Sequence, residues 1–237
     1  MKGPLVIAHR GFSGAAPENT PAAFRKAIRD GCDGLEFDLR LTREGRVAVL
    51  HDATVDRTTD GSGRVRSMTM ARLKGLDAGS WFDAPFRRQR IPPLEEVLAL
   101  GCRQRLLILD TKDLGTDWIG HFEPLLRRLP VLIASEFDGF LRSVRRHHPW
   151  VRTALTAEKA SDLVRARRLG CAAIDPRARL VDAAFMRRAR ALKLAVYPWT
   201  VNHPKEALRL ARLGVDGVIT NFPAPMRKLL ASPPRPR

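Results

Sequence analysis

The sequence predicts an α/β protein, a (β/α)8 TIM barrel with a small inserted subdomain between its second and third strands. Three observations support this prediction. Short apolar runs alternate with longer amphipathic ones, the alternation occurs eight times, and the chain has 237 residues. A doubly wound open sheet is the alternative, but such a sheet seldom needs eight strand–helix units in a chain of this length.

Each predicted unit pairs an apolar strand with an amphipathic helix. Apolar residues in the helices recur at three- and four-residue steps, and several helices end in glycine, as a helix C-terminus favours. The predicted strands are residues 5–10, 34–41, 105–112, 131–137, 151–156, 171–175, 194–201 and 216–222. The predicted helices are residues 20–31, 93–101, 118–129, 139–148, 160–170, 183–193, 204–214 and 225–231. Asn19 or Thr20 is the expected N-cap of the first helix, ahead of Pro21.

One segment interrupts this alternation. Residues 53–92, between "RVAVLHD" and "PPLEEVL", are rich in Gly, Thr, Asp and Arg. A connection of this length is uncommon, and such connections are usually functional or form small subdomains. We therefore expect a single barrel domain over residues 1–230, with an insertion at about 53–92. The Pro-rich basic tail at 231–237 is expected to be disordered.

The chain carries a formal charge of +17, and lysine contributes only eight of its 42 basic residues. A basic surface could bind nucleic acid or anionic lipid. The alternative is a compositional bias toward Arg and Ala, which would spread the same charge over solvated helices. No stretch alternates Arg with aromatic residues, so we expect no nucleic-acid partner and at most a weak attraction to anionic lipid.

The hydropathy of the chain bears on its location. No stretch approaches the roughly 20 apolar residues that a membrane span needs. The first strand also begins too early to leave room for a signal peptide. We therefore expect a cytoplasmic protein without stable membrane insertion, while the sequence leaves its oligomeric state open.

Carboxylates gather at the ends of the second and third predicted strands, where a barrel of this type places its active site. Glu36 and Asp38 lie two residues apart in "GLEFDLR", so both point to one face of the strand. Asp110 in "LDTK" adds a third carboxylate. Carboxylates buried side by side repel each other unless a cation neutralises them, and oxygen ligands suit a hard ion. The three residues therefore predict a site for one divalent cation, Mg²⁺ or Ca²⁺.

Basic side chains accompany these carboxylates. His9 and Arg10 end the first strand, and His51 lies in "AVLHD". Lys112 follows Asp110 on the same face of its strand. Each group alone could be structural, as a hydrogen-bonded histidine or a solvated edge strand, but the set at neighbouring strand ends indicates a functional site. Two imidazoles can exchange protons with a nucleophile and a leaving alkoxide. Arginine, lysine and a divalent cation stabilise a dianionic pentavalent phosphorus, so the residues fit phosphodiester cleavage.

Seven motifs resemble those of the glycerophosphodiester phosphodiesterase family, in nearly the same order, over residues 5–228. They are "AHRG…PENT", "GLEFDLRLTREG", "VLHDATVDRTTDGSG", "LDAGSWF", "IPPLEEVL", "PWTVN" and "GVDGVITNFP". The resemblance implies a barrel with a small insertion that uses a divalent cation to hydrolyse glycerophosphodiesters to glycerol 3-phosphate and an alcohol. By position, it implies His9 and His51 as the acid–base pair, without saying which is the acid. It also implies the metal ligands Glu36, Asp38 and Asp110 and the phosphate ligands Arg10 and Lys112.

Two positions depart from the family's pattern. The family usually has Glu where this chain has Asp110, and one methylene fewer shortens the reach by roughly 1.3 Å against metal–oxygen bonds of about 2.0–2.6 Å. Glu136 in "ASEF" stands where many relatives have Ser. If it pointed inward, it would favour a cationic alcohol such as choline or ethanolamine. Phe137 and Trp199 are candidates for the wall on the alcohol side of the pocket.

Two other functions stay open at this point. A lysophospholipase D acting on single-chain lipids would share the site, but it would need a long apolar groove beside Phe137 and Trp199. A non-catalytic barrel could bind anionic ligands through its arginines, although a mere binder has no need of the His9 and His51 pair. The leading hypothesis implies a small-molecule glycerophosphodiester as the partner.

Overall fold

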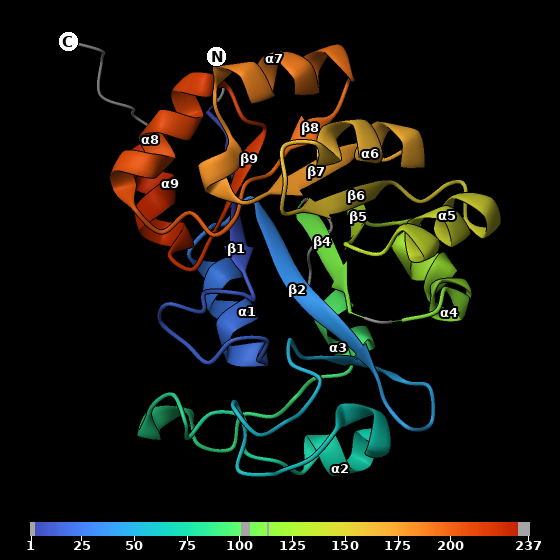
Figure 1. Cartoon of the computed structure of the whole chain (residues 1–237). Coiled ribbons are helices and arrows are strands. Elements are labelled where there is room, and N and C mark those ends of the chain that lie inside the picture. The colour runs from blue at the N-terminus through green and yellow to red at the C-terminus, as the bar shows by residue number, and fades with distance from the viewer. Residues whose placement is uncertain (1–2, 101–104, 113, 232–237) are drawn as a thin grey trace.

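Eight parallel strands form a nearly closed barrel in the computed structural model, which describes residues 3–100, 105–112 and 114–231 (Figure 1). In spatial order the strands are β9 (Gly217–Thr220), β1 (Leu5–His9), β2 (Gly34–Leu41), β4 (Leu106–Thr111), β5 (Val131–Ser135), β6 (Thr153–Ala157), β7 (Ala173–Pro176) and β8 (Ala195–Val196). Backbone hydrogen bonds from Asp216 N to Val196 O (3.1 Å) and from Ile219 N to Pro198 O (3.0 Å) join the β9 and β8 segments. The predicted fold class is confirmed.

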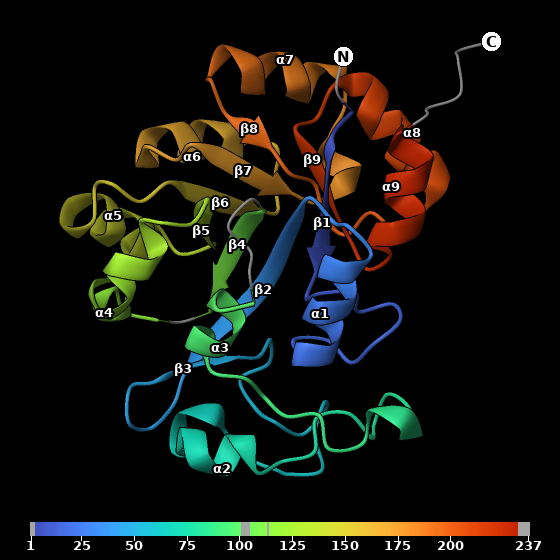
Figure 2. The ribbon, with the colours of Figure 1, turned by 180° about the vertical axis from the view of Figure 1, so that it is seen from behind.

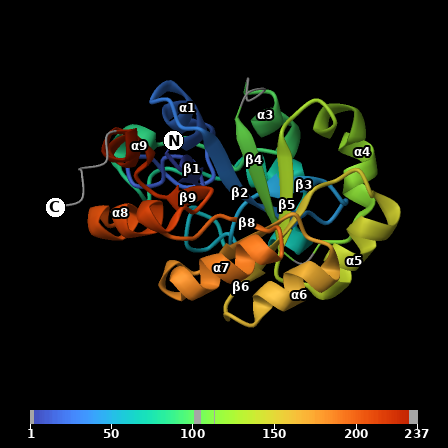
Figure 3. The ribbon, with the colours of Figure 1, turned by 90° about the horizontal axis from the view of Figure 1, so that it is seen from above.

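Helices surround the barrel, as the views from behind and from above show (Figure 2, Figure 3). They are α1 (Pro21–Arg29), α3 (Leu94–Leu98), α4 (Asp117–Leu126), α5 (Asp138–His147), α6 (Asp162–Leu169), α7 (Ala183–Ala191), α8 (Pro204–Leu213) and α9 (Pro223–Ala231). Thr20 is the N-cap of α1, and its side chain accepts a hydrogen bond from Ala23 N. Of the two expected N-caps, Thr20 therefore caps the helix and Asn19 does not.

Alternation along the strands sorts their side chains into two layers. In β2, Leu35, Phe37 and Leu39 point outward and pack in the core between the strands and the helices. Ile7 of β1 and Ile108 of β4 point inward and pack inside the barrel. Because successive side chains alternate between the faces of a strand, the inward row of each strand ends at the mouth of the barrel.

A strand that the sequence analysis did not predict, β3 (Val47–Val49), pairs antiparallel with the end of β2. Its three residues are too few for a period-of-two pattern to distinguish them from a loop. Leu39 pairs with Val49, and the next amide, Leu50 N, donates to Asp38 O at 3.0 Å. This hairpin brings the chain back to the barrel mouth, so that His51 follows beside β2.

The segment between β3 and α3 forms the inserted subdomain below the barrel, with the short helix α2 (Met70–Lys74) (Figure 1). It has a hydrophobic cluster of its own, made of Ala48, Leu50, Val55, Val65, Met68, Met70, Leu73, Ala78 and Ile91. The domain bounds 1–230 and 53–92 stay predictions, and residues 232–237 of the predicted tail lie outside the described residues. Every helix of the described ranges is too short or too polar to cross a lipid bilayer.

Candidate active site

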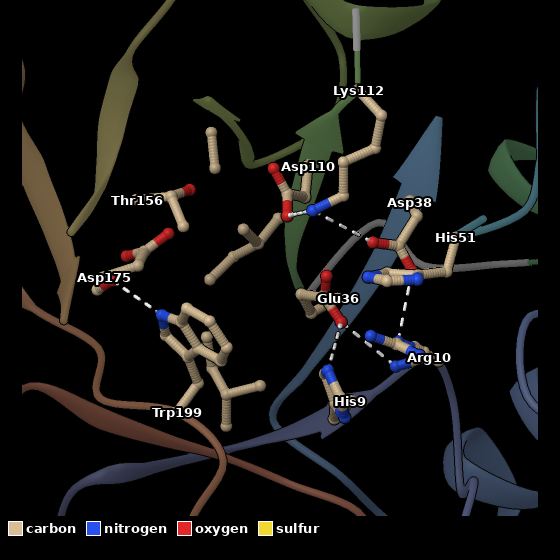
Figure 4. A pocket seen from close by; sticks show the side chains of 13 residues that line it. His9, Arg10, Glu36, Asp38, His51, Asp110, Lys112, Thr156, Asp175 and Trp199 are labelled. Carbon is tan, nitrogen blue, oxygen red and sulfur yellow. Dashed lines mark hydrogen bonds and ion pairs between the residues drawn. The ribbon is translucent and has the colours of Figure 1, made fainter. Parts of the chain in front are cut away.

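The inward rows of the barrel strands end in one pocket at the mouth of the barrel (Figure 4). The pocket has a volume of about 60 Å³. Its lining residues are His9, Arg10, Glu36, Asp38, His51, Ile108, Asp110, Lys112, Ala134, Thr156, Asp175, Trp199 and Ile219. All seven side chains for which a catalytic, phosphate-binding or metal-binding role was predicted are thus brought together.

Three carboxylates form the acidic part of this pocket. Ligand oxygens of Glu36, Asp38 and Asp110 all lie within 4.8 Å of one another, close enough to surround one ion at bonds of about 2.0–2.6 Å. Glu36 and Asp38 are 5% and 1% exposed, and the side chain of Asp110 is 14% exposed. Adjacent strands place them together, because Asp38 of β2 is paired in register with Asp110 of β4.

The pKa values of these carboxylates reflect their burial first and their mutual repulsion second. Burial, followed by repulsion from Asp38 and Asp110, raises the pKa of Glu36 well above its usual value. Burial likewise raises the pKa of Asp110 to about 6, although Lys112 acts in the opposite direction. For Asp38, burial is outweighed by Arg10 and Lys112, and the pKa falls. A divalent cation would relieve this repulsion, so the donor set fits a hard metal ion.

Arg10 and Lys112 place positive charge against the carboxylates. Arg10 Nε lies 3.2 Å from Asp38 Oδ2, and Arg10 Nη1 donates to Glu18 Oε1 at 2.8 Å. Lys112 Nζ donates to Asp110 and lies 3.5 Å from Asp38 Oδ1. Burial disfavours the charge of Lys112, but Asp110 and Asp38 outweigh it and raise the lysine pKa. Both side chains therefore stay charged at neutral pH.

The two histidines have different surroundings. His9 Nδ1 forms a hydrogen bond of 2.6 Å with Asn221 Oδ1, which leaves Nε2 facing Glu36 at 3.9 Å. Burial, and then the charge of Arg10, lower the pKa of His9 to about 4, so its ring is neutral at pH 7. His51 Nδ1 instead lies 2.6 Å from the carboxylate of Asp52, and its side chain is 34% exposed.

A chain of ion pairs connects the two halves of the site. Asp52 Oδ2 accepts from Arg57 Nε at 2.6 Å, and the other two nitrogens of this guanidinium donate to both oxygens of Glu18 at 2.7 and 3.0 Å. Since Glu18 also accepts from Arg10, the chain runs from Arg10 to His51. It ties the loop after β1 to the inserted subdomain, and it fixes the orientation of His51.

The sequence analysis missed several side chains of this site. Asn19 is buried, and its Nδ2 donates to Asp38 Oδ2 at 2.9 Å, although it was considered only as a helix cap. Glu18, Asp52 and Arg57 lie inside the quoted motifs "PENT" and "HDATVDRTTDGSG", and that position was the only signal for them. Asn221 follows β9 and lies inside the quoted motif "GVDGVITNFP", but no role was predicted for it.

The three predicted wall residues are placed differently. Trp199 lines the pocket, and its indole N–H donates to Asp175 O at 2.7 Å. Glu136 and Phe137 follow the end of β5 and are exposed, Phe137 to 46%. Neither residue lines the pocket, and Phe137 instead borders a surface depression beside Thr116 and Phe140.

Comparisons with known proteins agree with this geometry. The model of the glycerophosphoryl diester phosphodiesterase family matches residues 9–225. A glycerophosphodiester phosphodiesterase of Caldanaerobacter subterraneus is 35% identical over 238 residues, which cover 95% of this chain and 97% of the relative. One of Bacillus subtilis is 31% identical over 246 residues, covering 92% and 84%. A solved Oleispira antarctica phosphodiesterase, in complex with the product sn-glycerol-3-phosphate, is similar with a TM-score of 0.90 and 30% identity, covering 97% and 98%.

Proposed function

We propose, on the premise that the chain belongs to the glycerophosphoryl diester phosphodiesterase family, that it hydrolyses glycerophosphodiesters to glycerol 3-phosphate and an alcohol. The observation that carries this proposal is the convergence of three carboxylates, two cationic side chains and two imidazoles on one pocket. The Oleispira antarctica relative, similar over nearly the whole chain, was solved with glycerol 3-phosphate, which supports this product.

Glu36, Asp38 and Asp110 are the residues that would hold a divalent cation, Mg²⁺ or Ca²⁺. Their oxygens are close enough to share one ion. Burial and then mutual repulsion raise the pKa values of Glu36 and Asp110, and a bound cation would offset both effects. When bound, the cation supplies positive charge to the non-bridging oxygens of the phosphate. In this proposal Asp110 serves as a ligand although it is one methylene shorter than the usual Glu.

Arg10 and Lys112 bind the phosphate beside these carboxylates. Both are held in place by acidic partners, Arg10 by Glu18 and Lys112 by Asp110. Their donors therefore stand ready where negative charge grows as the phosphorus becomes pentavalent. Because the side chains are already oriented, little reorganisation is needed at the moment of reaction.

The two imidazoles divide the proton transfers. His9 is neutral at pH 7, and Asn221 holds its Nδ1, so Nε2 is free to accept a proton from the attacking water. Asp52 accepts a hydrogen bond from His51 Nδ1 and orients the ring. In its imidazolium form His51 carries a second proton on Nε2, which it gives to the leaving alkoxide to become neutral. We thus assign His9 as the base and His51 as the acid.

The pocket itself favours a small substrate over a single-chain lipid. Most of the described lining residues are charged or polar, which suits the phosphate and hydroxyl groups of a small diester better than an acyl chain. Phe137, which a lipid groove would use, lies outside this lining. We therefore keep a glycerophosphodiester as the proposed substrate.

The first experiment measures glycerol 3-phosphate release from glycerophosphocholine and glycerophosphoethanolamine, with EDTA, Mg²⁺ or Ca²⁺. We expect release that needs the cation and falls by about 10²–10⁴-fold in His9→Ala and His51→Ala, as the loss of a general acid or base implies. His147→Ala, at the exposed end of α5, is the matched control and should retain full activity. Release that persists in EDTA or in both site variants would contradict the mechanism.

A further inference from the structure

A buried carboxyl group on the far side of the pocket has no part in the reaction just described. Asp175 lies in β7, across the pocket from Glu36 and Asp38, and it lines the cavity together with Thr156 (Figure 4). Asp175 is 3% exposed. Its Oδ1 is buried and has no hydrogen-bond partner in the described part of the chain. A buried acceptor left unpaired is unfavourable, so a ligand that donates a hydrogen bond to it would gain affinity.

We propose that Asp175 and Thr156 form a subsite for the hydroxyl groups of the glycerol half of the substrate. This inference rests on the proposed function, because it places the phosphate beside Arg10 and Lys112. From that position, one ester arm of the phosphate extends across the pocket toward Asp175. One glycerol hydroxyl donates to Asp175 Oδ1, and the hydroxyl of Thr156, which can donate or accept, pairs with the other.

The enclosed position favours glycerol over the alcohol half of the substrate. The alcohol varies among glycerophosphodiesters, whereas the glycerol half is constant, and Asp175, only 3% exposed, lies at a buried end of the pocket that suits the constant half. Charge also argues against a choline there. The guanidinium of Arg177, whose Nε also donates to Glu158 at 2.7 Å, lies 4.4 Å from the ring centroid of Trp199. A quaternary ammonium at this face of the ring would compete with that guanidinium and meet its charge. An uncharged polyol meets no such repulsion.

The protonation of Asp175 suits a polyol as well. Burial, followed by repulsion from Asp110, raises the pKa of Asp175 well above its usual value. A carboxyl group that keeps its proton offers both a donor and acceptors, which complements two neighbouring hydroxyl groups. An ionised carboxylate would still accept from the same hydroxyls, so the subsite does not depend on the proton.

Binding of two phosphate monoesters tests this subsite without relying on turnover. Isothermal titration calorimetry with Mg²⁺ or Ca²⁺ present would compare sn-glycerol 3-phosphate with methyl phosphate, which lacks the hydroxyls. We expect wild-type protein to prefer glycerol 3-phosphate by about tenfold or more, the effect of one or two hydrogen bonds. Asp175→Ala and Thr156→Val should each reduce the preference several-fold and leave the affinity for methyl phosphate unchanged. Asp175→Asn, which keeps a donor and an acceptor, should retain most of it.

The controls separate this inference from the proposed function. Glu136→Ala removes an exposed carboxylate outside the pocket and should change neither affinity. Equal affinities in the wild type, an unchanged preference in both Asp175→Ala and Thr156→Val, or an equal loss for both ligands would overturn the subsite. If glycerol 3-phosphate binds as expected but glycerophosphodiesters are not cleaved, the proposed function fails and the subsite stands.

Discussion

Replacing Asp52 with Asn removes a single charge that acts on both the stability and the activity of this protein. In the wild type, Asp52 Oδ1 lies 2.6 Å from His51 Nδ1, and Asp52 Oδ2 lies 2.6 Å from Arg57 Nε. Asparagine has nearly the same shape but no charge, and its amide nitrogen presents hydrogens to one of these two partners. We expect the variant to lose both stability and turnover.

The size of the stability loss follows from the pKa of Asp52. Burial opposes the shift, but hydrogen bonds from Arg57 and His51 outweigh it and lower the pKa from 3.8 to about 2. A fall of this size corresponds to about 2.4 kcal/mol at neutral pH, at 1.36 kcal/mol for each pKa unit. The side chain of Arg57 is 46% exposed, so solvent screens the pair. We therefore expect Asp52→Asn to lower the free energy of unfolding by about 1–2 kcal/mol.

The pH dependence has a defined sign. Because folding lowers this pKa, the carboxylate stabilises the protein fully above pH 3.8, and the stabilisation is lost as the pH falls through about 2. Urea unfolding followed by circular dichroism should therefore give a constant difference between wild type and variant from pH 7 to pH 5. The difference should shrink to roughly half by pH 3.

A surface variant and the kinetics complete this test. Asp117→Asn, on the exposed start of α4, should change the free energy of unfolding by less than about 0.5 kcal/mol at any of these pH values. Asp52→Asn should also lower kcat at least about tenfold with little change in KM, because His51 loses its orienting partner. A stability difference that is the same at pH 5 and pH 3, or no larger than that of Asp117→Asn, would refute the reasoning.

Three further substitutions test other parts of the site. Asp110→Glu should weaken cation binding about tenfold or more in calorimetric titration, because the three carboxylates already lie close enough to share one ion; tighter binding would mean that Asp110 does not reach it. Asn19→Ala should lower the free energy of urea unfolding by about 2–3 kcal/mol. Asn19 is buried, has a φ of +57° that alanine adopts poorly, and donates a hydrogen bond to the carboxylate of Asp38. A loss below about 1 kcal/mol would contradict this. Gly11→Ala should destabilise more than Gly45→Ala, since both have positive φ but only the first would place a Cβ 2.7 Å from the backbone of Ala23; equal thermal shifts in the two variants would exclude the clash.

The sequence predicted the barrel well because two patterns recur regularly along it: apolar strands, and helices with apolar residues at three- and four-residue steps. Successive side chains of a strand point inward and outward in turn, and Leu35, Phe37 and Leu39 form the outward row of β2. The hairpin strand β3 was missed because its pairing partner, and not its own short pattern, makes it a strand. The choice between Asn19 and Thr20 as the N-cap of α1 was left open for a similar reason. The side chain of Asn19 instead donates a hydrogen bond to Asp38, 19 positions away, and the sequence alone does not show this contact.

Those site residues that lie on strands could be predicted from their spacing in the sequence. Glu36 and Asp38 follow from their two-residue separation, and Asp110 follows from its place at the end of another inward row. Their supporting groups come from elsewhere: Asn221 is 212 positions from His9, and Arg57 is 39 positions from Glu18. Glu136 could not be oriented from the sequence, because the alternation ends with β5 at Ser135.

Because the inserted subdomain has a hydrophobic cluster of its own, we expect it to open at a lower free energy than the barrel. His9 lies at the end of barrel strand β1, whereas His51 directly follows Leu50, a residue of the smaller cluster. Small cores contribute less stability, and protein regions can open locally with less free energy than global unfolding requires. Backbone amides near Leu73 should thus exchange with deuterium sooner than those of β4. On heating, activity would fade while the barrel is still intact, and the upper working temperature would depend on the packing of the insertion.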